Sequence, residues 1–361
     1  MPSSNELTIG FVRRGYSSGG AEAYLKRLAA GVTAVRHRVA LFTAADWPAG
    51  DWNFGPIVRL KAKSAIGFAD ELEKMAGANC NVLLSLERVW RCDVYRAGDG
   101  VHRAWLQRRN EIAGALQKLS RFFNRKHSAA LDLEESLFAN RRAGRVIANS
   151  RMVKDEIVQF YGYPADQIDI VYNGLPLELF RDDRSRATSR DEVVVLFAGS
   201  GWERKGLRFA MDAIEAQGGK MKLLVAGRGE PEKFSSSRTE FLGVVRDMPS
   251  LYRAADIFLL PTLYDPFSNA CLEALAAGLP VITTKANGVS EIIENNRHGT
   301  IIDDPRNVAA ISRALEFWSD PARRAEARIA NRQLAAQFDI SANVAKTLQI
   351  VTQTAASAAS T

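Results

Sequence analysis

The chain has 361 residues, of which 47% are apolar and 25% are charged, and 26 are glycine. These values exclude a fibrous or disordered protein and favour a globular protein large enough for two hydrophobic cores. No stretch approaches the roughly 20 apolar residues of a membrane-spanning helix, and the N-terminus lacks a secretion signal, so we expect a cytoplasmic protein. Cys80, Cys92 and Cys271 have no metal-type spacing and the four histidines are scattered, so we expect no metal site.

The net charge lies in the first half of the chain. Residues 1–175 contain 25 Lys and Arg against 18 Asp and Glu, whereas residues 176–361 contain 23 of each kind. Within residues 103–126, seven cations accompany one carboxylate, and apolar residues recur at near-helical spacing. This basic segment predicts an amphipathic helix or helix pair that binds an anionic membrane surface or an anionic partner. The alternative is the solvated face of an ordinary core helix.

Short apolar strands alternate with helical patterns along the chain. In the first half, we expect parallel strands within residues 7–13, 37–43, 81–86, 145–150 and 168–174, with helices at 19–34 and 150–162. After a polar linker near 175–192, a second series is expected within residues 193–199, 221–227, 239–243, 256–261, 280–284 and 299–303. This order predicts two doubly wound α/β domains in tandem. A last helix at about 340–356 is expected to pack back on the first domain.

The stretch LFAGSGWERKGLRFA, residues 196–210, reads as a buried strand, a glycine turn and a helix with two cations at its mouth. Ligands of parallel sheets bind at the carboxyl ends of the strands, where glycines let backbone amides approach an anion. Gly199 and Gly201 supply the turn, Lys205 is a point charge, and Arg204 can hold two phosphate oxygens. The spacing of an ATP-binding P-loop is missing. The alternative is a solvated helix start.

Two further segments carry related chemistry. Residues 13–29 contain a second glycine turn, in which Gly19 and Gly20 can bring amides to a phosphate or serve close helix packing. In PTLYDPFSNACLEALAAGLPVITT, residues 261–284, Ser268 or Asn269 can cap a helix that carries Glu273, eight residues after Asp265. A carboxylate aimed at a nucleotide can accept both ribose hydroxyls, although it can also compensate a helix dipole.

With these motifs the chain resembles the family-four retaining glycosyltransferases of the GT-B fold, in which two doubly wound Rossmann-like domains face each other across a cleft. The resemblance also rests on GGAE, ANSRMVKDEI, VYNGLPLELF, VAGRGE and GVSEII. It implies an acceptor-side domain at 1–175, a donor-binding domain at 176–339, and a nucleotide diphosphate sugar, such as a UDP-hexose, as co-substrate. No Asp-x-Asp triplet occurs, so we expect no metal or other cofactor.

The resemblance assigns roles to particular residues. Lys205 and Arg204 are expected to bind the diphosphate and stabilise the charge that develops there, and Glu273 to bind the ribose. The remaining nucleotide-sugar residues implied are Gly19, Gly20, Gly199, Gly227, Ser268 and Asn269. The chain departs from the family pattern at Ser200, where arginine is usual, and at Asp265, where glutamate is usual.

Residues 92–109, CDVYRAGDGVHRAWLQRR, resemble the bacterial glycosyltransferases of lipopolysaccharide core synthesis. This resemblance implies a lipid-linked saccharide acceptor and a position at the cytoplasmic face of the inner membrane, reached through segment 103–126. Asp99 and His102 are candidates for touching the donor sugar or the acceptor, and His102 can also be a packing residue. Asn173, Gly174 and Glu291 have either site or structural roles.

Other functions stay open at this point. The acceptor can be an exopolysaccharide precursor, a glycolipid or a small molecule. An epimerase or phosphorylase-like enzyme on the same fold is expected to have more acids and histidines in its first domain. A nucleic-acid-binding protein would show steeply salt-dependent affinity, and we expect no nucleic-acid partner. A nucleotide-sugar-binding protein without transferase activity, or a noncatalytic scaffold, would tolerate loss of Lys205 and Glu273.

Overall fold

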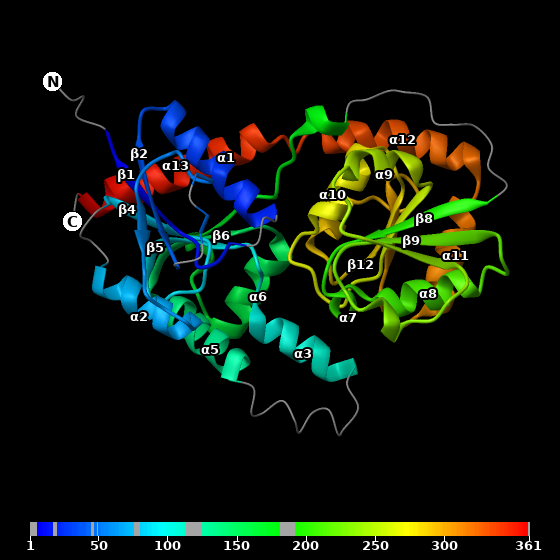
Figure 1. Ribbon diagram of the computed structural model, residues 1–361, viewed down its shortest axis with the longest axis horizontal. Coiled ribbons are helices and arrows are strands. Elements are labelled where there is room, and N and C mark those ends of the chain that lie inside the picture. Colours follow the sequence, from blue (N-terminus) through cyan, green and yellow to red (C-terminus); the bar gives the residue numbers. More distant parts are fainter. Residues whose placement is uncertain are drawn as a thin grey trace. The chain divides into compact units, whose positions relative to one another are not determined.

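The computed structural model describes residues 6–16, 20–44, 47–48, 50–75, 80–112, 125–180 and 192–359. Contacts divide the chain into two compact units (Figure 1). Unit 1 comprises Met1–Tyr172 and Ser341–Thr361, and unit 2 comprises Asn173–Ile340. Most of the predicted polar linker, residues 181–191, lies outside the described residues. In the part of the chain that is described, no helix combines the length and apolar character needed to cross a membrane.

Unit 1 is built on a parallel sheet in the order β3-β2-β1-β4-β5-β6-β7. Its strands are β1 (Thr8–Val12), β2 (Arg38–Thr43), β3 (Ile57–Arg59), β4 (Val82–Ser85), β5 (Cys92–Ala97), β6 (Ala143–Ala148) and β7 (Ile168–Ile170). Its helices are α1 (Gly20–Ala34), α2 (Ala65–Met75), α3 (His102–Ile112), α5 (Arg125–Glu134), α6 (Arg151–Tyr161) and α13 (Ile340–Ala359). Figure 1 shows α1 and α13 on one face of this sheet and α2, α5 and α6 on the other. The inner strands β1, β2 and β4 are therefore buried on both faces, which explains their apolar runs.

The helix α13 belongs to unit 1 although it ends the chain. It packs against α1, because the side chain of Val344 fills the space where a Cβ on Gly31 would lie. The ammonium of Lys346 donates to the carbonyl of Ile170 at 2.8 Å, which fastens α13 to the end of β7. The chain therefore enters unit 2 once and returns.

Unit 2 repeats the architecture with the order β10-β9-β8-β11-β12-β13. Its strands are β8 (Val193–Ala198), β9 (Met221–Ala226), β10 (Thr239–Gly243), β11 (Ile257–Leu260), β12 (Val281–Thr284) and β13 (Gly299–Ile302). Its helices are α7 (Trp202–Lys205), α8 (Leu207–Glu215), α9 (Met248–Ala254), α10 (Asn269–Ala276), α11 (Val308–Trp318) and α12 (Pro321–Ala335). In Figure 1, α8 and α11 cover one face, and α9, α10 and α12 cover the other.

The first residue of unit 2 shows why the contacts divide the chain there. The side-chain amide of Asn173 donates to the carbonyl of Phe267 at 3.1 Å and to the side chain of Asn269 at 2.7 Å, both within unit 2. Gly174 lies against the backbone of Asp339 and Ile340, so a side chain at this position would collide with the segment of chain that leaves the unit. Both residues thus have visible structural roles.

The strand order fixes where each unit can bind a ligand. In both sheets the chain winds outward from a central strand, first to one side and then to the other, so the order reverses between β1 and β4 and between β8 and β11. In open parallel sheets, the crevice outside the carboxyl ends of the strands at such a reversal is where ligands bind. The residues that follow β1, β4, β8 and β11 are therefore the first candidates for a site.

Candidate active site

The residues that follow β8 and β11 form an ion pair at the reversal point of unit 2. Lys205 Nζ lies 2.7 Å from Oδ2 of Asp265, and the two side chains are only 12% and 8% exposed. The stem of Lys205 crosses directly over Gly199, where a Cβ would lie 2.7 Å from its Cδ and Cε. Gly199 therefore opens the space through which the ammonium reaches the end of the sheet.

The two predicted cations lie at the end of a helix rather than at its mouth. Arg204 and Lys205 form the last turn of the four-residue helix α7, and Gly206 separates it from α8, which begins at Leu207. The sequence predicted a helix with these cations at its mouth, but Gly206 has φ +76° and ends α7 in the left-handed region. A cation in a last turn is favoured by the helix dipole.

The turn after β8 is held by its neighbours. The carbonyl of Arg204 accepts from the hydroxyl of Thr262 at 3.0 Å and from the amide of Leu263 at 2.8 Å. The indole of Trp202 donates to the carbonyl of Gly199 at 3.0 Å, and Gly227, after β9, comes so close that a Cβ would lie 2.2 Å from that carbonyl oxygen. The backbone is thus fixed on both sides of the two cations.

Arg204 keeps its charge available. Within the described residues, its guanidinium makes no ion pair, and the side chain is half-buried. Ser200, at the position where the family usually has arginine, accepts from the amide of Arg228 at 3.2 Å. The serine therefore joins the turn after β8 to the turn after β9.

Asn287 braces the loop that carries Asp265, and sequence reasoning missed this asparagine. Its side chain is fully buried, and its Oδ1 accepts from the amides of Ser268 and Val289, both at 3.2 Å. The backbone of Asp265 pairs with the same turn, donating to the carbonyl of Ala286 at 2.9 Å. The only signal in the sequence was an asparagine before glycine, which is a common turn former.

The helix α10 carries the second acid. Ser268 is its N-cap, and its hydroxyl accepts from the amide of Cys271. Glu273, in the second turn, accepts from the phenol of Tyr252 at 2.8 Å, and Tyr252 is fully buried. Tyr252 thus orients the Glu273 carboxylate from α9, and it is a second residue that sequence reasoning missed. Glu291 is exposed in the turn after β12.

The reversal point of unit 1 holds an arginine between two acids. Arg13, after β1, lies 3.1 Å from Glu22 of α1 and 2.8 Å from Glu87, which follows β4. Burial raises the pKa of Glu87, and Arg13 opposes that rise. The exposed Asp99, after β5, adds negative potential at Arg13 and Glu87. Gly20 is the first residue of α1, and Gly19 lies outside the described residues.

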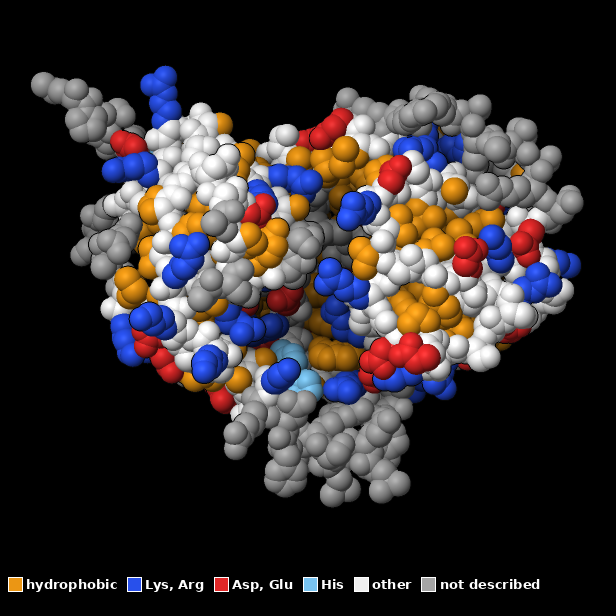
Figure 2. All heavy atoms as spheres, viewed as in Figure 1, with side chains coloured by type: hydrophobic (Ala, Val, Ile, Leu, Met, Phe, Trp, Pro, Cys, Tyr) orange, Lys and Arg blue, Asp and Glu red, His pale blue; other side chains and the backbone are white. Residues whose placement is uncertain are grey.

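His102 begins α3 directly after this edge of the sheet. Its Nε2 lies 3.0 Å from Nδ1 of His127 on α5, and Nη1 of Arg109 lies 3.4 Å from the other ring nitrogen of His127. Figure 2 shows histidine side chains together among basic side chains at the surface. Burial, followed by the charge of Arg88, lowers the pKa of His102 to about 4, against the opposing effect of Glu134. His102 is therefore neutral at pH 7.

This shift predicts how the stability of the protein depends on pH. Between its unfolded pKa of about 6.5 and its folded pKa of about 4, His102 binds more protons in the unfolded state. The free energy of unfolding therefore falls as pH falls through this window, because protons favour the unfolded chain. In urea unfolding at pH 7.5, 5.5 and 4.5, we expect His102→Gln to lose less stability than the wild type. Parallel losses in both proteins would contradict this assignment.

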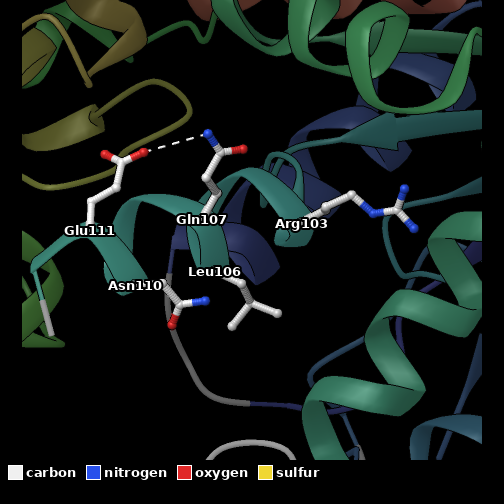
Figure 3. Close-up of a pocket in the computed structure, with 5 residues that line it drawn as sticks. All are labelled: Arg103, Leu106, Gln107, Asn110 and Glu111. Carbon is white, nitrogen blue, oxygen red and sulfur yellow. Dashed lines mark hydrogen bonds between the residues drawn. The ribbon is translucent and has the colours of Figure 1, made fainter. Parts of the chain in front are cut away.

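The described part of the basic segment is engaged with unit 1. Arg103 pairs with Glu135 at 3.2 Å, and Arg108 pairs with Glu156 at 2.8 Å. Residues 113–124 of the segment lie outside the described residues. A hollow of about 460 Å³ is lined by Arg103, Leu106, Gln107, Asn110 and Glu111. Figure 3 shows that all five come from α3, so the hollow is an open helix face.

The described histidines, cysteines and acids do not gather into a possible metal centre. Across the described ranges, no group of three or more histidine, cysteine or acidic side chains is placed to hold an ion. Burial raises the pKa of Cys271 to about 12, which keeps it protonated. Cys80 and Cys92 are also free thiols.

Two doubly wound parallel sheets, each with a charged site at its reversal point, define the chain as an α/β enzyme of the GT-B fold. Residues 192–319 match the family model described as "Glycosyl transferases group 1", and residues 18–179 match "Glycosyltransferase Family 4". A "Probable transglycosylase" of Burkholderia thailandensis is 30% identical over 77% of this chain and 76% of its own length. The chain belongs to glycosyltransferase family 4.

Other relatives agree on the class and differ in substrate. A D-inositol 3-phosphate glycosyltransferase of Catenulispora acidiphila is 29% identical over 58% of this chain and 57% of its own length. The chain thus spans only about half the length of several curated relatives it matches. Among solved structures, WaaG, a glycosyltransferase involved in lipopolysaccharide biosynthesis, superposes with a TM-score of 0.79 at 21% identity, covering 95% of this chain and 99% of its own. HepE of Anabaena, in complex with UDP-glucose, gives 0.68 at 20% identity over 95% and 100% of the chains.

Proposed function

We propose that this glycosyltransferase moves a hexose from a nucleotide diphosphate sugar to a lipid-linked saccharide with retention of configuration. The observation that carries the proposal is the Lys205–Asp265 pair over Gly199, at the reversal point of unit 2. A largely buried ammonium in reach of a carboxylate, with a second cation in the next residue, Arg204, suits an anion with more than one charge. A diphosphate satisfies that requirement.

The chemistry follows from where negative charge develops. Breaking the bond between the sugar and the diphosphate places charge on the leaving phosphate, and fixed cations there stabilise the transition state more than the ground state. Lys205 and Arg204 serve this purpose. Gly199 and Gly227 shape the turn beneath them, and their own amides donate to the carbonyls of Ala226 and Gly243. Glu273, held by Tyr252, accepts the ribose hydroxyls. Ser268 and Asn269 shape the start of α10 beside the nucleotide sugar.

Asp265 has a task that precedes its contact with the sugar. Its carboxylate holds the Lys205 ammonium at 2.7 Å before a donor arrives, and the donor diphosphate competes for that ammonium. Release of Asp265 then leaves its carboxylate free to accept a hydroxyl of the transferred hexose. The shorter side chain, compared with the usual glutamate, fits this position beside Lys205.

UDP is the favoured nucleotide, since the structurally similar HepE was solved with UDP-glucose. Unit 1 binds the acceptor, and Asp99 and His102 touch the saccharide. Gly20, the first residue of α1, and Gly19, which lies outside the described residues, are proposed to approach the donor diphosphate. Similarity to WaaG favours a lipopolysaccharide core acceptor. The segment 103–126 would then hold the enzyme at the anionic cytoplasmic face of the inner membrane. The relatives that act on inositol phosphate favour a small-molecule acceptor as the second candidate.

A panel of nucleotide sugars tests this proposal. Each is assayed with the full chain for donor hydrolysis and for thermal protection, because a ligand that binds only the folded state raises the melting temperature by mass action. We expect one UDP-hexose to protect most and to be hydrolysed, with the same rate in the presence of EDTA. No protection by any nucleotide diphosphate sugar would contradict the proposal, and salt-sensitive protection by oligonucleotides would favour a nucleic-acid partner.

A further inference from the structure

The loop that follows β5 is organised around one buried carboxylate. Glu134, the last residue of α5, is fully buried. Its Oε1 accepts from Nε of Arg88 at 2.8 Å and from the backbone amide of His102 at 2.6 Å. Its Oε2 accepts from the amide of Arg103 at 3.2 Å and from the phenol of Tyr161 at 2.8 Å. Four donors, from three different parts of unit 1, therefore converge on this side chain.

This carboxylate replaces a local helix cap. The first amides of α3 have no partner within the helix, and the residue before His102 is Val101, whose side chain cannot accept a hydrogen bond. Glu134 satisfies two of these amides from α5, and its negative charge suits the positive end of α3. A buried carboxylate is costly unless it is paired and hydrogen-bonded, so the arrangement depends on Arg88.

The other side of the same loop is held as well. Nη2 of Arg88 donates to the carbonyl of Gly100 at 2.8 Å, and the side-chain amide of Asn149 donates to the carbonyl of Gly98 at 3.2 Å. Asp99 lies between these two fixed carbonyls and is exposed. Arg88 binds the carbonyl of Gly100, and Glu134 binds the amides of His102 and Arg103, so the loop is held on both sides of Val101.

We infer that Glu134 is a positioning residue: through Arg88 and the first amides of α3, it fixes residues 98–103 so that Asp99 and His102 meet the saccharide. This inference rests on the proposed function, in which those two side chains touch substrate. Glu134 itself is fully buried and acts only through the loop. Its loss therefore displaces the loop and leaves the donor diphosphate site of unit 2 intact.

The test compares Glu134→Gln with Tyr161→Phe in the full chain. The glutamine lacks the charge and turns a donor toward Arg88 or the α3 amides, whereas Tyr161→Phe removes one donor that does not belong to the loop. With the donor sugar found in the panel, we expect Glu134→Gln to lower the kcat of sugar transfer by about tenfold to a hundredfold. The donor KM and the affinity for UDP stay within about twofold, and each protein molecule still binds one UDP. Tyr161→Phe keeps kcat within about twofold.

The stoichiometry separates positioning from folding, because a merely destabilised protein loses UDP sites in parallel with activity. If Glu134→Gln does not fold, Arg88→Lys decides: it keeps the charge beside Glu134 and loses the bond to Gly100, and we expect kcat to fall at least about threefold at unchanged KM. If the wild type turns over a nucleotide sugar and the deciding variant has the same kcat, the inference about Glu134 is overturned and the proposed function is not affected. A wild type that turns over no nucleotide sugar overturns the proposed function and this inference with it.

Discussion

Replacing Lys205 with alanine is expected to lower kcat/KM for sugar transfer by about a hundredfold to a thousandfold, or about 2.7 to 4 kcal/mol, by analogy with the loss of one oxyanion-stabilising donor. The ammonium lies at the reversal point of unit 2 and can reach a phosphate oxygen by leaving Asp265. The matched control is Lys222→Ala, which removes a half-buried lysine of β9 that pairs with Glu240 of β10, away from the site. That variant should keep wild-type kinetics.

A second variant separates chemistry from stability in this experiment. Lys205→Ala leaves the Asp265 carboxylate, which is 8% exposed, without its cation, and an unpaired buried charge destabilises the fold. In the double variant Lys205→Ala with Asp265→Asn, the charge is gone, so the melting temperature should recover. Activity should stay low. Recovery of activity together with stability would mean that Lys205 only supports the fold.

The second large effect is expected at Gly206, which separates α7 from α8. A Cβ at this position would lie 2.0 Å from the carbonyl oxygen of Pro261, and φ is +76°. Alanine there combines a left-handed backbone with a backbone collision, so we expect Gly206→Ala to destabilise unit 2 by about 2 to 5 kcal/mol. Because Gly206 follows Lys205 directly, kcat/KM should fall as well.

Gly218 supplies the matched control for this substitution. It follows α8, has φ +61°, and a Cβ added there would meet open space. Gly218→Ala therefore carries the backbone strain without the collision, at a cost of about 1 to 2 kcal/mol, and should leave activity unchanged. Thermal unfolding of both variants measures the difference. Equal melting temperatures would show that the contact of Gly206 with Pro261 has no energetic weight.

Inner strands such as β4, β8 and β11 could be predicted because each is buried on both faces, and an uninterrupted apolar run is what such a strand requires. The strand β5 could not, because its sequence includes Asp93 and Arg96. Arg96 is only 4% exposed, and its guanidinium lies 4.4 Å from the ring centroid of Tyr24 on α1. A charged residue is tolerated in this central strand because a ring distant in sequence covers it.

The candidate site was predictable where one short segment carries it. The glycine turn with Lys205 and the spacing of Asp265 and Glu273 are local patterns. The ion pair between Lys205 and Asp265, 60 residues apart, depends on the sheet order, which brings the ends of β8 and β11 together. Glu134 and Asn287 were missed. Glu134 accepts from a backbone amide 32 residues away, and Asn287 accepts from one 19 residues away. An isolated polar residue gives no local signal for such a partner.

The most direct measurement of the central claim is a crystal structure of the full chain soaked with UDP. The account predicts the diphosphate at the carboxyl end of β8, with Nζ of Lys205 moved from Asp265 to within hydrogen-bond distance of a phosphate oxygen, about 2.7 to 2.9 Å. UDP bound elsewhere, with the Lys205–Asp265 pair undisturbed, would contradict it.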